Sequence, residues 1–269
     1  MRQPALVCSH GNCVLNISVK VTLITVCYNS AAHIASALRS VDAQSWPDIE
    51  HLIIDGASLD DTLQVVPEHC QPWRQVLSES DLGIYDAMNK GLALATGDIV
   101  GFLNADDTLA DTEVVARVAR AAEAGAVAVY GDLEYVSATG QRVRYWKAGA
   151  YHRQRLARGW MPPHPTFYAR RELFQCLGGF DLRYRIAADY DLMLRFLARG
   201  GVTPSYVPEV QVRMLTGGVS NRSLSNLMLK SFEDWQVLRR NRVGGLLTLL
   251  AKNLVKIPQF LHSLHAGAR

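Results

Sequence analysis

The first 125 residues alternate between stretches of strand character and stretches with helical spacing. Four strand-like runs occur at 21–28, 49–55, 74–80 and 98–104. Helical patterns lie between and after them, at 31–44, 58–69, 83–97 and 111–125. Strands that alternate with helices favour a mainly parallel sheet with helices on both faces. The chain is therefore predicted to be an α/β protein.

The pattern changes after residue 125. Residues 126–136 and 141–146 predict an antiparallel hairpin around the turn SATG. A helix over 190–200 and a strand over 203–214 are expected next, and the sequence from Leu224 onward is helical and basic. Because no repeat or low-complexity linker interrupts the chain, three parts are predicted: an N-terminal extension (1–19), one α/β domain (20–221) and a helical tail (222–269).

Composition excludes several classes of protein. Of the 269 residues, 49% are hydrophobic and 20% are charged, which is typical of a folded globular protein. The net charge of +3 is too small to indicate a nucleic-acid binder. Five cysteines at irregular spacings indicate neither a zinc site nor a disulfide framework, which favours a reducing, cytoplasmic setting. No stretch resembles a signal peptide or reaches the ~18 apolar residues of a membrane span.

Polar residues follow each strand-like run of the first half. In an open α/β sheet, ligands bind at the carboxyl ends of the strands, where neighbouring loops converge. The residues at these ends are Tyr28, Asn29, Asp55, Glu79, Asp81, Asn104, Asp106 and Asp107. A rim rich in carboxylates suggests a divalent cation with oxygen ligands. From the spacing alone, however, Asp106 or Asp107 could equally cap a turn.

Two features of the second half also have a structural alternative. Asp189 and Asp191 stand at a predicted helix start, where an acid is favourable because of the helix dipole alone. His164, between prolines in MPPHPTF, could be an ordinary loop histidine. Spacing by itself indicates an α/β protein with a cation site and no specific activity.

Four segments together carry a resemblance. They are LITVCYNSAAHIASALRSVDAQSW, HLIIDGASLDDT, DLGIYDAMNKGLALATGDIVGFLNADD and FDLRYRIAADYDLMLR, in this order. They resemble the family 2 glycosyltransferases, in the form that builds bacterial exopolysaccharides and cell-envelope glycolipids. The resemblance covers roughly residues 21–220. It implies the GT-A fold, a Rossmann-like, mixed and mainly parallel sheet with helices on both faces, here followed by the helical tail.

The resemblance also implies a nucleotide-binding side of the site. Tyr28 and Asn29 match positions that line the nucleotide pocket, and Asp55 matches the acid that hydrogen-bonds the base, commonly uracil. The positions that match contacts with the nucleotide and its phosphates are Asp81, Asn89 and Lys90. A nucleoside-diphosphate sugar, with UDP favoured, is the implied donor.

Metal-binding and catalytic roles follow from the same resemblance. NADD matches the DxD element, so Asp106 would bind Mn²⁺ or Mg²⁺, with Asn104 in place of the first acid as a ribose contact or weak ligand. In AADYD, Asp189 matches the general base, with Ala188 where the family often has Glu. The predicted acceptor-side residues are His164, Thr166 and Asp191, and residues 216–220 match a loop that closes over the donor.

The function implied is that of an inverting, metal-dependent glycosyltransferase, a hexosyltransferase with a saccharide or lipid-linked acceptor. A carboxylate can deprotonate the acceptor hydroxyl, and a metal ion can stabilise the leaving nucleoside diphosphate. One alternative is a non-catalytic sugar-nucleotide or glycan binder, which Asn104 and Ala188 motivate. Another is a sugar-nucleotide pyrophosphorylase, but CYNSAAH lacks the Gly-rich phosphate loop that such an enzyme needs.

The tail is strongly basic, with eight Lys or Arg against two acids, a net charge of +6. Its mixture of cations with Leu, Val, Ile and Phe has two interpretations. It could make peripheral contact with an anionic leaflet at the inner face of the cell membrane, where a lipid-linked acceptor would lie. It could instead pack on the catalytic domain with a solvated basic face.

Overall fold

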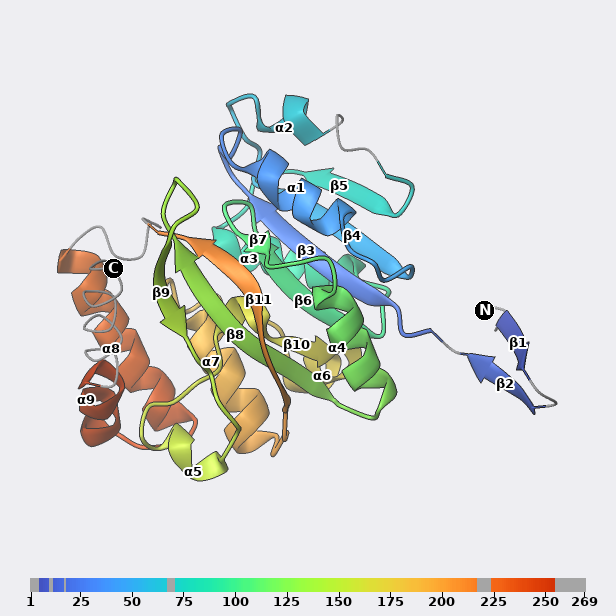
Figure 1. Cartoon of the computed structure of the whole chain (residues 1–269). Helices are drawn as coiled ribbons and strands as arrows, with labels where there is room; N and C mark the ends of the chain where they lie inside the picture. The colour runs from blue at the N-terminus through green and yellow to red at the C-terminus, as the bar shows by residue number, and fades with distance from the viewer. Residues whose placement is uncertain (1–4, 10–11, 17, 67–70, 217–223, 255–269) are drawn as a thin grey trace, which may run out of the picture.

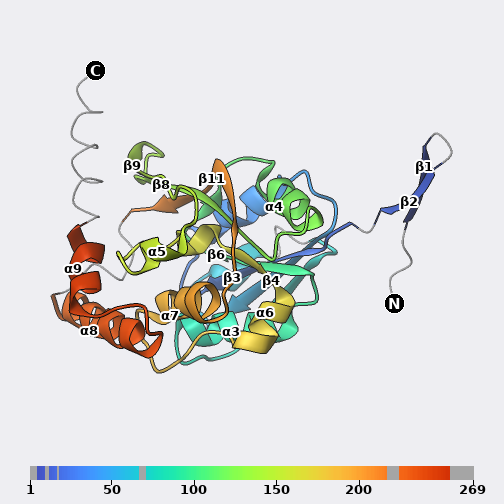
Figure 2. The same cartoon turned by 90° about the horizontal axis from the view of Figure 1, so that it is seen from below.

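The computed structural model describes residues 5–9, 12–16, 18–66, 71–216 and 224–254. Its body is one mixed, mostly parallel sheet with helices on both faces, as Figures 1 and 2 show. The strand order is β5-β4-β3-β6-β10-β8-β11-β7, with β9 paired to β8. These strands are β3 (Val21–Cys27), β4 (Ile49–Asp55), β5 (Arg74–Ser78), β6 (Ile99–Asn104), β7 (Thr108–Leu109), β8 (Ala128–Val136), β9 (Arg142–Trp146), β10 (Tyr168–Arg170) and β11 (Ser205–Leu215).

The chain reverses its direction of progress across the sheet at β3. From β3 it moves to β4 and β5 on one side, and then to β6 on the other, all four strands being parallel. The carboxyl ends of β3 and β6 therefore meet at a topological switch point, where open α/β sheets bind ligands. Beyond β6 the short strand β10 runs antiparallel between β6 and β8, and β8 pairs in parallel with β11.

The helices are α1 (Ile34–Asp42), α2 (Thr62–Val65), α3 (Ile84–Leu94), α4 (Val114–Glu123), α5 (Arg153–Leu156), α6 (Arg171–Leu177), α7 (Ala188–Leu194), α8 (Leu224–Arg240) and α9 (Leu246–Leu254). A 3-10 turn spans His164–Thr166, and α7 continues as a π-helical turn over Arg195–Arg199. Alternating strand side chains divide the core between the two faces of the sheet. On β3, Leu23 packs with α1 and α4, and Ile24 packs with α3.

Most expected elements are present, with local corrections. The apolar residues Ile34, Ala37, Leu38 and Val41 of α1 are all buried. In α3, Ala87 and Met88 are buried, whereas Ile84 is 47% exposed. The helix also ends before Gly97, whose backbone packs against Thr22. The short strands β7 and β10 were not predicted, because two or three residues cannot show a period.

Gly101 in β6 explains how β10 fits beside it. A Cβ atom at this position would lie 2.2 Å from the ring of Tyr168 on β10. Only glycine leaves room for the aromatic ring over the strand. The first half of the domain is thereby joined to the second directly beneath the end of β6.

Two further parts flank the sheet. At the N-terminus, β1 (Ala5–Ser9) and β2 (Asn12–Asn16) form a separate antiparallel hairpin. At the C-terminus, α8 and α9 lie beside α7, and Val237, Leu238 and Leu249 join the same hydrophobic core as α7. Residues 222–223 and 255–269 of the predicted tail lie outside the described residues. Within the described ranges, no helix is long and apolar enough to cross a membrane.

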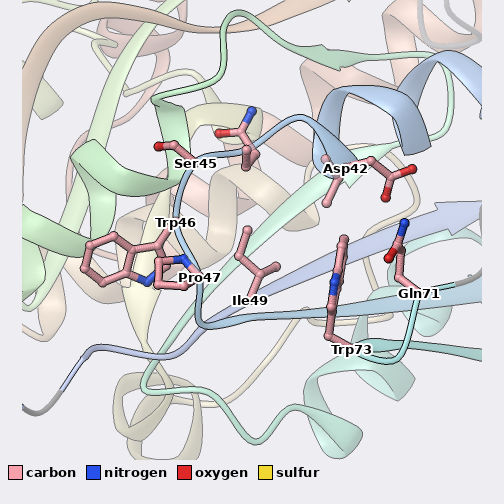
Figure 3. A pocket seen from close by; sticks show the side chains of 9 residues that line it. Asp42, Ser45, Trp46, Pro47, Ile49, Gln71 and Trp73 are labelled. Atoms are coloured by element: carbon pink, nitrogen blue, oxygen red, sulfur yellow. The ribbon is translucent and has the colours of Figure 1, made fainter. Parts of the chain in front are cut away.

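A small hollow of about 240 Å³ lies at the amino end of β4 (Figure 3). Asp42 at the end of α1, Trp46 and Trp73 are among its lining residues. Its position is the edge of the sheet opposite to the carboxyl ends of the strands. None of the predicted site residues lines it, so it is separate from the candidate site.

Candidate active site

The loops after β3 and β4 are locked together at the carboxyl edge. Asn29 has a φ of 50°, a left-handed conformation that asparagine tolerates well. Its Oδ1 accepts a hydrogen bond from the Leu59 amide (2.8 Å), and its own amide donates to Ser58 Oγ (2.8 Å). Beside it, Tyr28 is 59% exposed. The loop is thus fixed while the aromatic ring of Tyr28 stays open to solvent.

Asp55, at the end of β4, is fully buried. It accepts hydrogen bonds from the Ser58 amide (3.0 Å), Ser78 Oγ (2.7 Å), Cys27 Sγ (3.6 Å) and Ser58 Oγ. Burial favours a higher pKa, but these hydrogen bonds, led by Ser58, outweigh it and lower the pKa of Asp55. The carboxylate therefore ties together the ends of β3, β4 and β5. The predicted hydrogen bond from Asp55 to the base stays a prediction.

Tyr28, Gly56 and Asp81 converge at the ends of β3, β4 and β5. A Cβ atom on Gly56 would lie 2.5 Å from Asp81 Oδ2 and 3.4 Å from the Tyr28 ring. Asp81 Oδ1 accepts a hydrogen bond from the Gly83 amide (2.8 Å), where α3 begins. Gly56 has no side chain, so its backbone is accessible between the exposed ring of Tyr28 and the carboxylate of Asp81. We call these three residues the floor of the site, and a flat ligand can approach this floor closely.

Lys90 and Asn89 on α3 point to different surroundings. Lys90 Nζ donates to the Ser80 carbonyl (2.7 Å) and pairs with Glu79 Oε1 (2.9 Å). The hydrogen bond to Glu79 is the main cause of a raised pKa of Lys90. Asn89 instead donates to the Phe180 carbonyl (2.9 Å) and accepts from the Phe180 amide (2.8 Å). Its side-chain amide therefore holds Phe180, and the predicted contact with the nucleotide and its phosphates stays a prediction.

The two adjacent carboxylates after β6 are separated by depth. Asp106 is exposed, whereas Asp107 is fully buried. Burial, and then the nearby charge of Asp106, raise the pKa of Asp107 to about 8. Asp107 accepts hydrogen bonds from Asn104 Nδ2 (3.1 Å) and from the Leu215 amide (3.3 Å). Asp107 therefore anchors the turn to β11, and Asp106 alone faces outward.

Asn104 and Asp106 offer oxygen atoms suited to a hard cation. The Asn104 Oδ1 atom is buried and has no hydrogen-bond partner in the part of the chain that the structure describes. A buried acceptor without a protein partner is left for water or a ligand to satisfy. No group of three His, Cys, Asp or Glu side chains among the described residues could hold a metal by itself. The pair would supply two oxygen ligands to a Mg²⁺ or Mn²⁺ ion.

Asp189 lies in the first turn of α7 and is half-buried. Its Oδ1 atom accepts a hydrogen bond from the Tyr190 amide (2.7 Å) and lies 3.4 Å from the hydroxyl of Tyr85. That hydroxyl also donates to the Ile186 carbonyl (2.7 Å). One carboxylate oxygen is thus held in place, and no described residue hydrogen-bonds the other.

An aromatic cluster connects Asp189 with the end of β6. Tyr85 stacks on Phe180 (5.4 Å between ring centroids), and Phe180 meets the edge of Phe102 (5.1 Å). His164 stacks on Phe102, with 5.7 Å between the ring centroids, and Phe102 lies two residues before Asn104 in the sequence. Burial lowers the pKa of His164, with the charge of Asp189 acting in the opposite direction. Its Nε2 atom is buried and has no partner among the described residues, so a neutral imidazole is available near the carboxylate.

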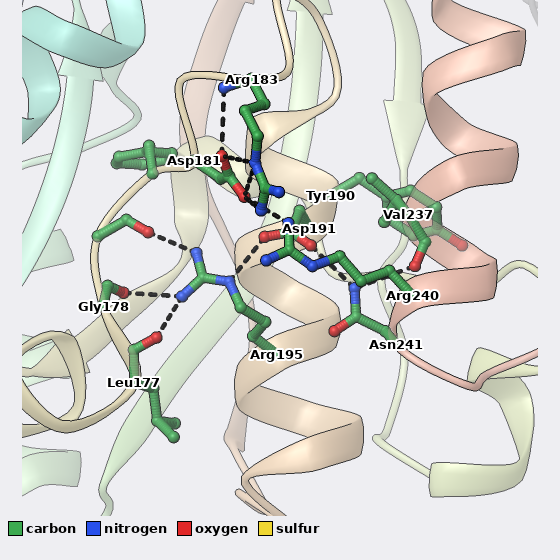
Figure 4. Close-up of polar contacts among 12 residues, drawn as sticks. Leu177, Gly178, Asp181, Arg183, Tyr190, Asp191, Arg195, Val237, Arg240 and Asn241 are labelled. Atoms are coloured by element: carbon green, nitrogen blue, oxygen red, sulfur yellow. Dashed lines mark hydrogen bonds and ion pairs between the residues drawn. The ribbon is translucent and has the colours of Figure 1, made fainter.

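Thr166 and Asp191, which are predicted to lie on the acceptor side, make structural hydrogen bonds within the protein. Both side chains are fully buried. Thr166 Oγ1 is hydrogen-bonded to Gly131 and Pro163. Asp191 accepts hydrogen bonds from Arg195 Nε (2.6 Å) and Asn241 Nδ2 (2.9 Å), as Figure 4 shows. Their predicted place on the acceptor side stays a prediction, and the predicted donor loop beyond Thr216 lies outside the described residues.

Glu233 is a residue of the site's framework that sequence analysis missed. It lies on α8, is 5% exposed, and accepts hydrogen bonds from three successive amides at 2.8–2.9 Å. The donors are Arg185, Ile186 and Ala187, which lead into α7 two residues before Asp189. The only available signal was that Glu233 and Asp234 are the sole acids in a basic segment.

A second buried contact joins α9 to the same place. Lys252 Nζ pairs with Asp234 Oδ1 (2.8 Å), and both side chains are almost fully buried. The same Nζ lies 3.3 Å from the centroid of the Tyr190 ring, a cation–π contact beside Asp189. Helices α8 and α9 therefore both contact the start of α7, through Glu233 and Lys252 respectively.

Comparison with known proteins gives a consistent picture. A family model described as Glycosyl transferase family 2 matches residues 22–178. A PGL/p-HBAD biosynthesis glycosyltransferase of Mycobacterium bovis is 33% identical over 215 residues, covering 78% of this chain and 82% of the relative. The succinoglycan biosynthesis protein ExoO of Rhizobium meliloti is 29% identical over 248 residues, covering 84% of this chain and 70% of the relative.

Two solved structures share the fold. The fragment 1–349 of S. aureus TarS, in complex with UDP-GlcNAc, has a TM-score of 0.64 at 19% identity. The match covers 83% of this chain and 66% of that fragment. The mannosyltransferase PcManGT from Pyrobaculum calidifontis, in complex with GDP-Man and Mn²⁺, has a TM-score of 0.63 at 21% identity, covering 94% of this chain and 76% of that one. The predicted GT-A fold is confirmed.

Proposed function

The chain belongs to Glycosyl transferase family 2, and from this we propose that it is an inverting, metal-dependent hexosyltransferase. It transfers one sugar from a nucleoside-diphosphate donor, with UDP favoured, to a hydroxyl of a saccharide or lipid-linked acceptor. It acts in the cytoplasm, and at the inner face of the membrane when the acceptor is lipid-linked. The observation that carries the proposal is Asp189, a partly exposed carboxylate. The aromatic cluster joins it to β6, which ends at Asn104, two residues before Asp106.

The donor occupies the floor between Tyr28, Gly56 and Asp81. The exposed Tyr28 ring offers a flat apolar face to the base. Asn29 and Asp55 fix the two loops that flank this floor. Lys90 remains protonated and adds positive charge beside the phosphates. Two fold relatives bind UDP-GlcNAc and GDP-Man, which supports a nucleotide-sugar donor without deciding the base.

Asp106 and the Asn104 Oδ1 atom would hold the divalent cation. Such an ion supplies a Lewis acid that neutralises charge on the departing diphosphate. Asp107 keeps the turn in place from below through Asn104 and β11. Because this protein contributes one exposed carboxylate and one amide oxygen, most of the remaining ligands come from the donor's phosphates.

On the acceptor side, Asp189 takes the proton of the attacking hydroxyl. The Tyr190 amide orients one of its oxygen atoms, and the other is directed to the acceptor. His164, neutral because it is buried, can hydrogen-bond an acceptor hydroxyl through Nε2. Inversion at the anomeric carbon needs one general base and no covalent intermediate.

A second candidate is a non-catalytic sugar-nucleotide or glycan binder. Asn104 in place of an acid, and the fully buried Ala188 beside Asp189, favour it. The third option, a pyrophosphorylase, lacks a Gly-rich loop after β3, where the chain instead makes the hydrogen bonds of Asn29. A binder predicts donor affinity without any transfer.

Calorimetric titration with UDP, GDP and TDP, each with and without Mn²⁺, tests the donor half of the proposal. We expect one nucleotide to bind tightly and to require the metal. Nucleotide binding of equal affinity with and without Mn²⁺ would contradict the role of Asp106 as a metal ligand. Donor binding in the absence of sugar transfer to any acceptor would favour the binder, and no nucleotide binding would contradict both candidates.

A further inference from the structure

The charged side chains of α8 are sorted by depth. Glu233 and Asp234 are 5% and 2% exposed and are held by the turn before α7 and by Lys252. Arg239 and Arg240, in the last turn, are exposed. The acids of α8 are thus withdrawn into the protein, and the charge that α8 presents to its surroundings at this end is positive.

The same helix exposes large apolar side chains. Met228, Phe232 and Trp235 are 74%, 55% and 39% exposed. Their spacing of four and three residues places them on one face of the helix, and Arg239 follows four residues later. The rings of Phe232 and Trp235 stack at 6.1 Å. A row of large apolar residues in solvent marks an interaction surface rather than an ordinary surface.

A pocket lies where this row meets the arginines. It has a volume of about 670 Å³ and is lined by Arg183, Tyr184, Trp235, Gln236, Arg239 and Arg240. No carboxylate is among the described residues that line it. Asp181 accepts hydrogen bonds from both Arg183 (2.6 Å) and Arg240 (2.6 Å), which Figure 4 shows, and so orients two of the guanidinium groups.

The charge of the pocket matches a phosphate group. Three guanidinium groups face one carboxylate, which leaves a local charge of about +2 for an anion. Guanidinium groups bind phosphate with fixed geometry, and the adjacent Trp235 ring is suited to the boundary between water and apolar chains. A soluble anion would contact only the arginines. It would leave the exposed Met228 and Phe232 side chains without a partner, whereas a lipid membrane would contact both kinds of side chain.

We propose that this face of α8 docks on an anionic lipid membrane. The docking face consists of Met228, Phe232, Trp235, Arg183, Arg239 and Arg240. Its apolar side chains enter the interfacial layer of the membrane, and its arginines bind lipid phosphate groups. Because Glu233 on the same helix holds the turn before Asp189, the docking face is connected to the general base through α8. This last consequence, though not the docking itself, rests on the proposed function.

Co-sedimentation of the full chain with lipid vesicles tests the docking face. One set of vesicles contains phosphatidylcholine alone, and the other contains phosphatidylglycerol as well. We expect binding to the anionic vesicles that weakens with salt. Arg239→Gln with Arg240→Gln should lower that affinity by about fivefold for each arginine. The matched control is Arg120→Gln with Arg142→Gln, two exposed arginines that also pair with acids.

The apolar row is tested separately. Met228→Ser with Phe232→Ser should lower vesicle binding at high salt, where charge contributes least. The control is Val127→Ser with Val143→Ser, at side chains 40% and 43% exposed elsewhere. All variants are compared by thermal melting, and because every changed side chain is exposed, we expect them to melt like the parent protein. Nucleotide titration of the same variants should be unchanged.

Three results would overturn the proposal. The first is equal binding to neutral and anionic vesicles, or none to either. The second is loss of a dimer in sedimentation velocity when Met228 and Phe232 are changed, which would assign the face to a second copy. The third is loss of inorganic phosphate binding in the arginine variant while vesicle binding persists. Vesicle binding can succeed even where sugar transfer fails, so the two proposals are tested independently.

Discussion

For the acidic residues of the site, the role depends on how deeply the side chain is buried, because the residue type is the same. Each of two acidic pairs contains one carboxylate at the surface of the site and one inside the protein. Asp106 is exposed and Asp107 is buried, and Asp189 is partly exposed while Asp191 is buried. A like-charged pair at close range is tolerated because one member is neutralised by protonation or by a cation. The buried member of each pair supports the segment that presents the outer one.

Substitutions at Asp189 and Asp191 should therefore have opposite consequences. Asp189→Asn should reduce sugar transfer by roughly 10²- to 10⁴-fold and leave donor affinity and stability unchanged. Asp191→Asn should cost about 3 kcal/mol in the free energy of unfolding, because Arg195, whose side chain is only 12% exposed, loses the carboxylate that balances its charge. Transfer rates, donor titration and urea unfolding of both variants check this. Unreduced transfer in Asp189→Asn would remove the residue from the mechanism.

Asp106→Asn tests the metal ligand. The variant should lose roughly 10- to 100-fold in the Mn²⁺-dependent part of donor affinity, and the metal-free affinity should stay the same. Titration of the nucleotide at several Mn²⁺ concentrations measures this. Glu123→Gln, which removes an exposed acid on α4, is the control for a general change of surface charge. An equal loss in both variants would contradict a ligand role.

Neighbouring elements are joined by buried polar groups as well as by apolar packing. Glu50 on β4 is 3% exposed and accepts hydrogen bonds from Lys20 Nζ (2.8 Å), Thr22 Oγ1 (2.6 Å) and the Thr96 amide (2.7 Å). It thereby holds the amino ends of β3, β4 and β6 in register. Burial favours a higher pKa of Glu50, but these hydrogen bonds outweigh it and lower the pKa from 4.5 to about 2.

This cluster predicts a specific dependence of stability on pH. Because the pKa of Glu50 is lower in the folded than in the unfolded protein, its contribution is present above pH 4.5 and lost as pH falls toward 2. Glu50→Gln should lower stability by about 2 kcal/mol at neutral pH and less at pH 2 to 3. Urea unfolding of both proteins across this range is the measurement. A difference that stays constant with pH would contradict an ionised Glu50.

Across the whole molecule, the C-terminal helices belong to the framework of the site. Glu233, Val237 and Leu238 on α8 are buried against the rest of the protein, and Lys252 on α9 reaches Tyr190. The described part of the tail thus packs on the catalytic domain, as one of its two interpretations proposed. The other interpretation, contact with an anionic membrane, is proposed above for the exposed face of α8 alone. The boundary at residue 221 stays a prediction.

Glu233→Gln tests how far this framework controls the reaction. An amide can accept only through its single oxygen, so the turn over 185–187 should loosen and shift Asp189. We expect kcat to fall about tenfold, with an unchanged KM for the donor. Glu50→Gln is the control, since it has a comparable loss of stability at the far end of the sheet. If kcat fell equally in both variants below their melting temperatures, a positioning role for Glu233 would be ruled out.

The amino-acid sequence by itself determined the alternation of β3, β4, β5 and β6 with their helices, because the period of apolar residues is a local property of a segment. The acidic residues of the site could also be named from motifs. Only the tertiary structure decided which of them face a ligand, since depth depends on elements far apart in the chain. Asp107 is buried by β11, Asp191 by Asn241, and Asn89 is occupied by Phe180. Glu233 could not be predicted for the same reason, because its three hydrogen-bond donors lie 46–48 residues away in the sequence.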